Sequence, residues 1–400
     1  MTWSDVLAYG VLALTYLGLG LGYLPGYRMN RAAIAITGAA LLVVLGVLDL
    51  EEAWAALDSN TLVFLFGVMV LNAHLGYAGF FQLVMDRLVH LARSPLGLLV
   101  WLTFGTGVLS ALFLNDTMAI LLTPLVLALT RTLSLPPVPY LLALAGATNL
   151  GSVATLTGNP QNILVGSFSR IPYLEFALAL TPVALVGLGL QVGLLCWLYP
   201  AVRSREPLPP LPPLRFRLNR GLLTKGLLIT VGLLGAFLLN YPLAQAALVA
   251  AGLSLLSRRI RSERFFSRVD WELLVMFSGL FMVTRAVGEL GLLRPLEALA
   301  RSPEGLLWIT AGLSNLISNV PAVLLLHPLI PQGDTPGWLM LAAASTLAGN
   351  LTLLGSVANL IVAEAARREG HKLGFLEHLR FGLPLTLLTL LLAYGWIYHR

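Results

Sequence analysis

The chain alternates between long apolar runs and short polar segments. A helix rises about 1.5 Å per residue, so a run of about 20 apolar residues can cross the hydrocarbon core of a bilayer. The first run lacks a basic leader and a small-residue cleavage site, so we interpret it as a retained span. The pattern predicts ten membrane-spanning helices, near residues 5–24, 31–50, 59–77, 138–168, 173–199, 222–240, 243–257, 271–289, 338–365 and 381–398.

Two further apolar stretches, 97–130 and 304–330, have polar residues at their middle. The first contains Asn-Asp-Thr at 115–117 and the second contains Ser-Asn at 318–319. Each stretch is too short for two full crossings, and irregular backbone at membrane depth needs protein or water around it. We therefore predict two re-entrant helical hairpins, each with its polar tip at membrane depth.

Two of the predicted spans, 138–168 and 338–365, contain residues that disfavour a continuous helix. Gly-Asn-Pro at 158–160 is expected to break the first span, because proline removes a helix hydrogen bond and glycine is flexible. Gly349 and Gly355 are expected to loosen the second span in the same way. Each half of the chain therefore has one predicted broken helix.

The two halves of the chain share a repeat. The segment Leu91–Gly97 returns as Leu299–Gly305 with one difference. Further matches keep their order, at offsets that fall from 212 through 208 and 204 to 197, as small loop deletions would produce. The matched residues are Asp58, Gly67 and Gly76 with Asp270, Gly279 and Gly288; Ser110, Asn115 and Pro124 with Ser314, Asn319 and Pro328; and Thr155, Gly158 and Asn162 with Thr352, Gly355 and Asn359.

Charged residues are scarce and unevenly placed. They make up 11% of the 400 residues, against roughly a quarter in a soluble domain, and the mean hydropathy is +0.83. If both termini lie outside, 20 of the 25 basic residues fall in cytoplasmic loops, which satisfies the positive-inside rule. The basic, proline-rich segment 203–220 is then a cytoplasmic linker between residues 1–202 and 221–400.

This topology runs equivalent segments of the two halves in opposite directions. The predicted fold is an all-α polytopic membrane protein, built as an inverted-topology repeat of about five spans per half. Each half has a re-entrant helical hairpin and a broken helix. Inverted repeats of this kind are typical of transporters that work by alternating access.

Nearly all polar residues at membrane depth lie at the hairpin tips and the helix breaks. Helix N-termini there would direct free amides and partial positive charge at an anion, while side-chain oxygens and unwound carbonyls suit Na⁺. Asn159 and Asn319 are expected to cap helices whose first residues are Pro160 and Pro321. The candidate substrate- and ion-binding residues are Asn115, Asp116, Thr117, Thr157, Gly158, Asn159, Asn162, Ser318, Asn319, Asn350, Thr352, Gly355, Ser356 and Asn359.

Asp116 is the strongest single candidate among them. A carboxylate at membrane depth costs several kcal/mol, so intramembrane acids usually serve a function. We interpret Asp116 as the proton or cation carrier, and the alternative is a carboxyl group that only stabilises the start of a hairpin arm. Its repeat mate is Val320, so only one hairpin has a titratable tip, which would suit a single coupling-ion site.

Other function classes find little support. The chain has no zinc-protease motif, no phosphate-binding loop with lysine and no serine–histidine arrangement that would suggest an enzyme. The single cysteine excludes a cysteine metal cluster, and we expect no cofactor beyond Na⁺ or H⁺ as the coupling ion. The basic clusters follow the topology, so we expect no nucleic-acid partner. An ATPase partner stays open, and an ion channel is an alternative that the paired hairpins disfavour.

At these motifs the chain resembles the ArsB/NhaD-type ion transporter superfamily, whose members share a citrate-transporter-like domain. The similarity rests on Asn-Asp-Thr at 115–117, Gly-Asn-Pro-Gln-Asn at 158–162, Ser-Asn-Val-Pro-Ala at 318–322 and Gly-Ser-Val-Ala-Asn at 355–359. It implies a scaffold domain and a mobile transport domain, commonly in a homodimer, with an elevator-type motion. It also implies that the tips and breaks form the binding sites.

The tips depart from those of the dicarboxylate carriers, which have a Ser-Asn-Thr motif at both. Here the first tip reads Leu-Asn-Asp and the second Ser-Asn-Val, which favours the arsenite, inorganic-anion and Na⁺/H⁺ branches. We expect a secondary transporter in a prokaryotic inner membrane that moves a small inorganic anion or oxyanion-like solute with H⁺ or Na⁺. The alternatives are a Na⁺/H⁺ antiporter and an arsenite exporter.

Overall fold

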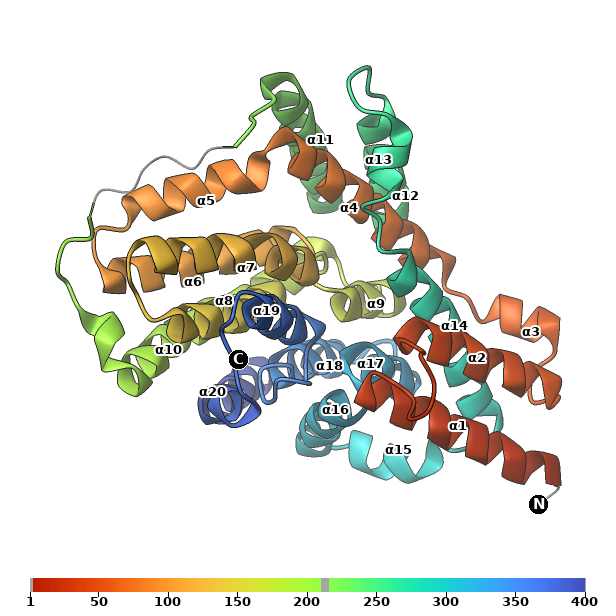
Figure 1. Ribbon diagram of the computed structural model, residues 1–400. Coiled ribbons are helices and arrows are strands. Elements are labelled where there is room, and N and C mark those ends of the chain that lie inside the picture. The colour runs from red at the N-terminus through yellow and green to blue at the C-terminus, as the bar shows by residue number, and fades with distance from the viewer. Residues whose placement is uncertain (1–2, 210–215, 400) are drawn as a thin grey trace.

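The computed structural model describes residues 3–209 and 216–399, and every regular element in them is a helix (Figure 1). The first half contains α1 (Trp3–Leu21), α2 (Arg31–Val44), α3 (Leu50–Ala55), α4 (Ser59–Ala78), α5 (Phe80–Leu91), α6 (Pro95–Leu112), α7 (Asn115–Thr132), α8 (Pro137–Ser152), α9 (Pro160–Ser169), α10 (Tyr173–Leu198) and the short η1 (Pro200–Arg203). The second half contains α11 (Arg220–Leu238), α12 (Leu243–Leu255), α13 (Ser262–Phe266), α14 (Trp271–Glu289), α15 (Arg294–Ala300), α16 (Pro303–Ile317), α17 (Asn319–Leu326), η2 (His327–Leu329), α18 (Thr335–Ala348), α19 (Val357–Arg368) and α20 (Phe375–Tyr398).

Seven helices in the described ranges are long and apolar enough to cross a membrane: α1, α4, α6, α10, α11, α14 and α20. Six of them coincide with predicted spans, and α6 lies in the stretch 97–130, where we predict a hairpin. That stretch forms α6 and α7, each 18 residues or about 27 Å long, joined at Phe113 and Leu114. The helix α6 is long enough for a full crossing, so the length of this stretch no longer supports a re-entrant path. The re-entrant hairpin stays a prediction.

The predicted span 31–50 is wrong at its C-terminal end. The helix α2 stops at Val44, and the chain then turns through Gly46, whose φ of +73° is a conformation that glycine adopts without strain. Asp49 caps the next helix, α3, in a capping box with Glu52. The predicted span is therefore a helix followed by a turn, and only its last residue, Leu50, belongs to the next helix. Hydropathy does not mark the end of α2, because apolar residues continue through the turn.

The centre of the molecule consists of α8 and α18. Every residue of 139–152 in α8 and of 337–348 in α18 is buried. α6 and α7 pack on α8, α16 and α17 pack on α18, and α10 and α20 contact both each other and these central helices. A helix that is covered on all sides in this way is expected to be apolar all round, so its few polar residues need an explanation.

Long helices of the two halves pack on each other through matched small residues. α12 packs on α4, and α2 packs on α14. A Cβ added to Gly67 of α4 would lie 2.5 Å from the Ala247 carbonyl oxygen, and one added to Gly279 of α14 would lie 2.6 Å from the Ala35 carbonyl carbon. Gly67 matches Gly279 in the repeat, and Ala35 matches Ala247 at the same offset. The same close backbone contact is therefore built twice, each time between the halves.

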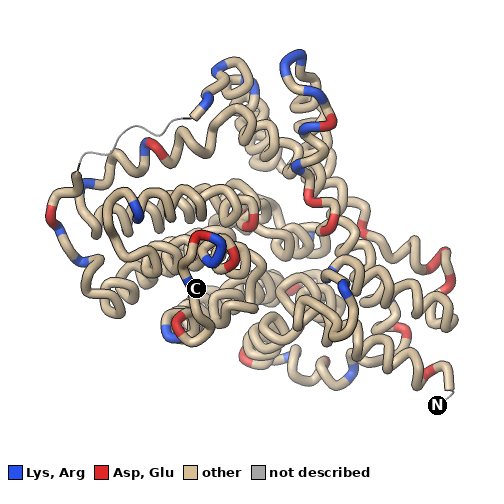
Figure 2. The backbone as a smooth tube through the Cα atoms, viewed as in Figure 1, with Lys and Arg blue, Asp and Glu red and all other residues tan. Residues whose placement is uncertain are grey.

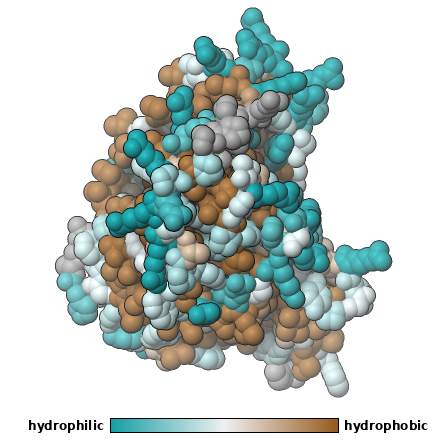
Figure 3. All heavy atoms as spheres, turned by 60° about the vertical axis from the view of Figure 1, so that its left-hand side comes forward, coloured by the Kyte–Doolittle hydropathy of each residue, from teal (hydrophilic) through white to brown (hydrophobic). Residues whose placement is uncertain are grey.

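The outer surface carries many large apolar side chains, as expected for contact with lipid. Leu228 and Val231 on α11 are each 68% exposed, and Trp197 on α10 is 70% exposed. Hydrophobic residues form broad areas of the surface in Figure 3. Lys and Arg gather instead at helix ends and loops, notably around α11, α13 and the end of α19 (Figure 2).

Candidate functional site

The first hairpin tip is joined to the first helix break. The backbone amide of Asn115, at the start of α7, donates to the Gly158 carbonyl oxygen at 2.9 Å. The Asn115 side chain is buried, and its Oδ1 has no hydrogen-bond partner in the described structure. Asp116 and Thr117 follow in the first turn of α7 and line a cavity. The tip therefore presents polar groups that the protein itself does not fully satisfy.

Asparagine side chains hold the first break in shape. Asn159 caps α9, because its Oδ1 accepts from the Asn162 backbone amide at 2.8 Å. The Asn162 amide group donates to the carbonyls of Ser152 and Thr155, at 3.0 and 2.9 Å. Carbonyls left free at the end of α8 are thus paired inside the protein. The hydroxyl of Thr157 bonds the Ala111 carbonyl of α6 at 3.2 Å.

The second break repeats this geometry. The amide group of Asn359 donates to the carbonyls of Gly349 and Thr352, at 2.8 and 3.1 Å. These acceptors match Ser152 and Thr155 at the offset that also relates Asn359 to Asn162. The Thr352 hydroxyl donates to Asn315 Oδ1 on α16 at 3.2 Å.

The second tip differs from its prediction in one detail. α17 begins at Asn319, so Asn319 is its first residue and does not cap a helix starting at Pro321. Ser318 stands at the cap with a φ of +82° and makes no side-chain capping bond. The side-chain amide of Asn319 has acceptors on one side, so its nitrogen is placed there and donates to the Gly355 carbonyl at 3.1 Å. The tip therefore contacts the second break, as the first tip contacts the first break.

The central helix of each half also holds the break of the other half. Asn149 of α8 donates to Asn350 Oδ1 at 2.9 Å and to Asn359 Oδ1 at 3.3 Å. Its own Oδ1 accepts from the Ser356 hydroxyl at 3.0 Å. The polar residue in this buried helix is thus explained by bonds to the second break.

Thr346 of α18 does the same for the first break. Its Oγ1 accepts from Asn159 Nδ2 and Gln161 Nε2, both at 3.2 Å, and lies 3.4 Å from Asn162 Oδ1. Asn149 and Thr346 occupy matched positions, because they are related by the same offset as Asn162 and Asn359. Neither was a candidate from the sequence, although the repeat offset applied to polar positions in α8 and α18 could have found both.

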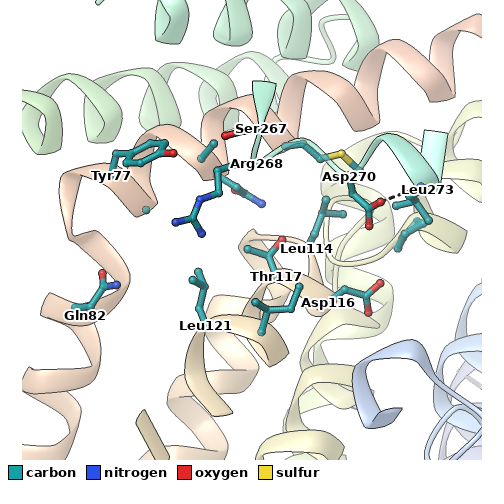
Figure 4. A pocket seen from close by; sticks show the side chains of 16 residues that line it. Tyr77, Gln82, Leu114, Asp116, Thr117, Leu121, Ser267, Arg268, Asp270 and Leu273 are labelled. Atoms are coloured by element: carbon teal, nitrogen blue, oxygen red, sulfur yellow. Dashed lines mark hydrogen bonds between the residues drawn. The ribbon is translucent and has the colours of Figure 1, made fainter. Parts of the chain in front are cut away.

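A cavity of about 290 Å³ opens in front of the first tip. It lies between α4, α5, the tip and the segment that leads into α14 (Figure 4). Its polar lining residues include Asn72, Gln82, Asp116, Thr117, Arg268 and Asp270. Of the predicted residues, the cavity thus brings Asp116 and Thr117 together with polar groups from the other half, whereas the asparagines of the breaks are used in holding the backbone.

The charges around this cavity come from both halves of the chain. Asp116 interacts electrostatically with Asp270 and with Arg31, whose Nε donates to the Leu19 carbonyl at 3.0 Å. The Arg268 guanidinium lies 5.5 Å from the centre of the Tyr77 ring. In Figure 4 Arg268 and Asp116 extend into the region from different elements. Neither tip contains an arginine, and Arg268 was missed because its cluster was interpreted only as a topology signal.

Comparison with known proteins agrees with this architecture. The citrate transporter family, CitMHS, matches residues 19–348. The silicon efflux transporter LSI3 of Oryza sativa subsp. japonica is 31% identical, over 96% of this chain and 94% of the relative. The inner membrane protein YbiR of Escherichia coli is 30% identical, over 86% of this chain and 89% of the relative.

The crystal structure of the Alcanivorax borkumensis YdaH transporter has a similar fold. Its TM-score is 0.59 at 17% identity, with 98% of this chain and 97% of that chain covered. The resemblance to the ArsB/NhaD-type superfamily is in keeping with these relatives. The chain belongs to the citrate transporter family, and it is an integral membrane transporter.

Proposed function

We propose that this protein is a secondary active transporter that moves a small inorganic anion or oxyanion-like solute, coupled to H⁺ or Na⁺. The observation that carries the proposal is the cavity at the first tip. It collects one carboxylate on the tip, Asp116, a guanidinium from the other half, Arg268, and the amide groups of Asn72 and Gln82. A coupled transporter needs such neighbouring sites for a cation and for a polar solute.

The matched contacts of the two halves support an inverted repeat that works by alternating access. The bonds of Asn162 and Asn359 recur at one offset, as do the cross-half bonds of Asn149 and Thr346. Two equivalent halves running in opposite directions can exchange conformations, which would open the site to each side of the membrane in turn. In the elevator version of this mechanism, the tips and breaks move together, and their mutual hydrogen bonds favour such a unit.

The solute that we propose to test first is a small hydroxylated oxyacid. The rice relative is named a silicon efflux transporter. In neutral water, dissolved silicon is mainly silicic acid and arsenite is mainly arsenous acid. Both are uncharged hydroxides that donate and accept hydrogen bonds. The amides of Asn72 and Gln82 could bind such a solute, and Arg268 could bind its deprotonated form. Arsenite is therefore the nearest alternative substrate, and the protein would then be an arsenite exporter.

A Na⁺/H⁺ antiporter is the second candidate function. It is favoured by Asp270, a second carboxylate in the cavity that interacts with Asp116. In this case the cation would be the transported species.

For either function we place the protein in the inner membrane as a homodimer, with both termini outside and the linker 203–220 in the cytoplasm. The E. coli relative is named an inner membrane protein, which supports that membrane.

The deciding experiment is proton flux in proteoliposomes that contain a pH-sensitive dye. Wild type is compared with Asp116→Asn, and with Asp334→Asn as a control that removes a carboxylate at the cap of α18. The solutes are Na⁺, Li⁺, silicate, arsenite, phosphate, sulfate and citrate. We expect silicate or arsenite to drive proton movement in wild type and in Asp334→Asn, and Asp116→Asn to abolish the coupling.

The other outcomes assign or reject the function. If Na⁺ or Li⁺ alone discharges the proton gradient, the antiporter is correct. If solute uptake depends on neither a proton nor a Na⁺ gradient, and Asp116→Asn equals wild type, Asp116 is structural and the proposed coupling mechanism is wrong.

A further inference from the structure

Asp58 and Asp270 are matched residues at the start of matched helices. Asp58 caps α4 by accepting from the Thr61 backbone amide, at 3.3 Å. Asp270 caps α14 by accepting from the Leu273 backbone amide, at 2.9 Å. Thr61 and Leu273 are matched at the same offset, so the two carboxylates have the same backbone role.

The two carboxylates differ in what else they bind. Asp58 Oδ2 also accepts from the Thr61 hydroxyl and from the Ser167 hydroxyl, the latter at 2.6 Å. Leu273 stands at the position that matches Thr61 and has no hydroxyl. Within residues 3–209 and 216–399, the Leu273 backbone amide is the one hydrogen-bond donor found for the Asp270 carboxylate.

The match to Ser167 does not bind Asp270 either. At the offset of the break region, Ser167 is replaced by Glu364, whose carboxylate pairs with Arg367 at 2.9 Å and Arg368 at 3.2 Å. Both changes relative to the first half therefore remove donors from Asp270. They leave one of its oxygens available on the side of the cavity.

The available oxygen of Asp270 shares its cavity with Asp116. Figure 4 shows both carboxylates on the same side of the cavity, on different elements. Asp270 is exposed to the cavity and Asp116 is half-buried. Two neighbouring carboxylates repel each other, and a cation or a proton bound between them relieves this repulsion. The nearby positive groups are Arg31, which interacts with Asp116, and Arg268 in the cavity wall.

A second, independent observation points to a ligand here. Asn72 lines the same cavity, is 4% exposed, and has no hydrogen-bond partner for either its Nδ2 or its Oδ1 in the described structure. A buried amide without partners carries a free-energy cost that a bound ligand or water would relieve. The Thr117 hydroxyl and the two carboxylates are oxygen donors of the kind that Na⁺ prefers, and the unpaired amide oxygen of Asn72 lies in the same cavity wall.

We propose that Asp270 is the second carboxylate of the coupling-ion site, and that a monovalent cation, Na⁺ or a proton, binds between Asp116 and Asp270. Asn72 and Thr117 supply further oxygens. The inference rests on the proposed function, because it names a residue of the same cavity. Since Asp116 lies on the first tip and Asp270 at the start of α14, the cation joins a tip of one half to a long helix of the other. Opening of the cavity then requires release of the cation.

The test compares Asp270→Asn with Asp58→Asn. Asparagine also caps helices, so both variants keep the cap and lose one negative charge at matched positions. In proteoliposomes, we expect Asp270→Asn to raise the Na⁺ concentration for half-maximal solute transport by about tenfold or more, because a charged ligand is lost. Asp58→Asn should stay within about twofold of wild type, and Asp270→Glu should recover most of the affinity.

A separate arm without Na⁺ distinguishes the two cations. If the bound species is a proton, Asp270→Asn moves the pH midpoint of solute transport in this arm to lower pH. The Na⁺ response measured in the first arm is then the same in Asp270→Asn and wild type. This direction follows because a site with one carboxylate less needs a higher proton concentration to be occupied. If Asp270→Asn behaves as Asp58→Asn does in both arms, the inference is wrong.

A binding measurement separates this inference from the proposed function. For purified protein in detergent, the bound cation, supplied either as Na⁺ or as H⁺ by lowering the pH, should raise the thermal midpoint of wild type and of Asp58→Asn relative to that of Asp270→Asn. This holds even if no tested solute is transported. Leu273→Thr gives Asp270 the hydroxyl that Asp58 has, and should weaken the cation response several-fold without removing a charge. An unchanged cation response in Leu273→Thr and Asp270→Asn alike would overturn the assignment.

Discussion

Arg268 and Asp116 come from different halves of the chain and line one cavity. Arg268 belongs to a basic loop that the predicted topology places in the cytoplasm, and in that topology the positive-inside rule is enough to explain its presence. Arg268 also lies over Tyr77, in a lining that includes Gln82, so its guanidinium is part of the cavity wall. A guanidinium in this place would favour an anionic solute over a neutral one.

We expect Arg268→Gln to discriminate between the two forms of the solute. Loss of a charged hydrogen bond, about 1.5–3 kcal/mol, should raise the half-saturating concentration of an anion about tenfold or more. The half-saturating concentration of a neutral hydroxide should change little. The measurement is uptake into proteoliposomes at two pH values that interconvert the forms, with Arg264→Gln on α13 as the control. Equal effects on both forms would show that Arg268 does not contact the solute.

Residue chemistry at the tips and breaks follows from the sequence only in part. Asn162 and Asn359 were predicted as site residues because they lie at the helix breaks and in the motifs of the resemblance. In the structure their amide groups donate to backbone carbonyls of their own half. The partners of these two asparagines lie seven to ten residues away in the sequence, so a local motif can identify them. Asn149 lies in the first half and its partners Asn350 and Asn359 in the second, so no local pattern links them.

At the scale of elements, the apolar pattern locates long helices well. The predicted span 271–289 has the same bounds as α14, and 173–199 differs from α10 by one residue. Apolar runs are poor guides to where the backbone turns inside them. The span 31–50 contains a turn at Gly46, and the helix that follows Ser318 starts two residues before the proline expected to begin it. These turns depend on positive φ angles and caps, which hydropathy does not report.

The packing of α2 on α14 gives a prediction for one element. A Cβ on Gly279 would overlap the Ala35 backbone, whereas one on Gly288 of the same helix meets no atom within 4 Å. Alanine in a helix is favoured over glycine by about 0.5–1 kcal/mol, so Gly288→Ala should be neutral or slightly stabilising. Gly279→Ala should cost about 1–3 kcal/mol through overpacking. Thermal unfolding of the purified protein in detergent compares the two, and equal midpoints would contradict this packing.

At the scale of the whole molecule, the halves are interlocked. The packing of α12 on α4, of α2 on α14, and the bonds of Asn149 and Thr346 all join one half to the other. The repeat was visible in the sequence as ordered matches. The sequence did not show which helices of one half pack on which helices of the other. That information lies in contacts between residues far apart in the sequence, such as Gly67 with Ala247.

We therefore expect the halves to need each other for stability. A chain cut between residues 209 and 216 and expressed as two pieces should yield a complex, in which a tag on one piece purifies both. Each piece expressed alone should be degraded or aggregate, because its long helix would expose a small-residue surface that is normally covered. A first half that purifies alone as a folded monomer would contradict the interlocked arrangement.

The pairing of α4 with α12 also constrains how the protein is made. A ribosome adds residues from the N-terminus, so Gly67 is inserted long before Ala247 exists. During this interval α4 can contact only lipid, other early helices or the insertion machinery. The first half must therefore wait in an immature arrangement until synthesis has passed Leu255, the last residue of α12. Translation speed through the linker and α11 thus becomes a variable that affects the yield of the finished transporter.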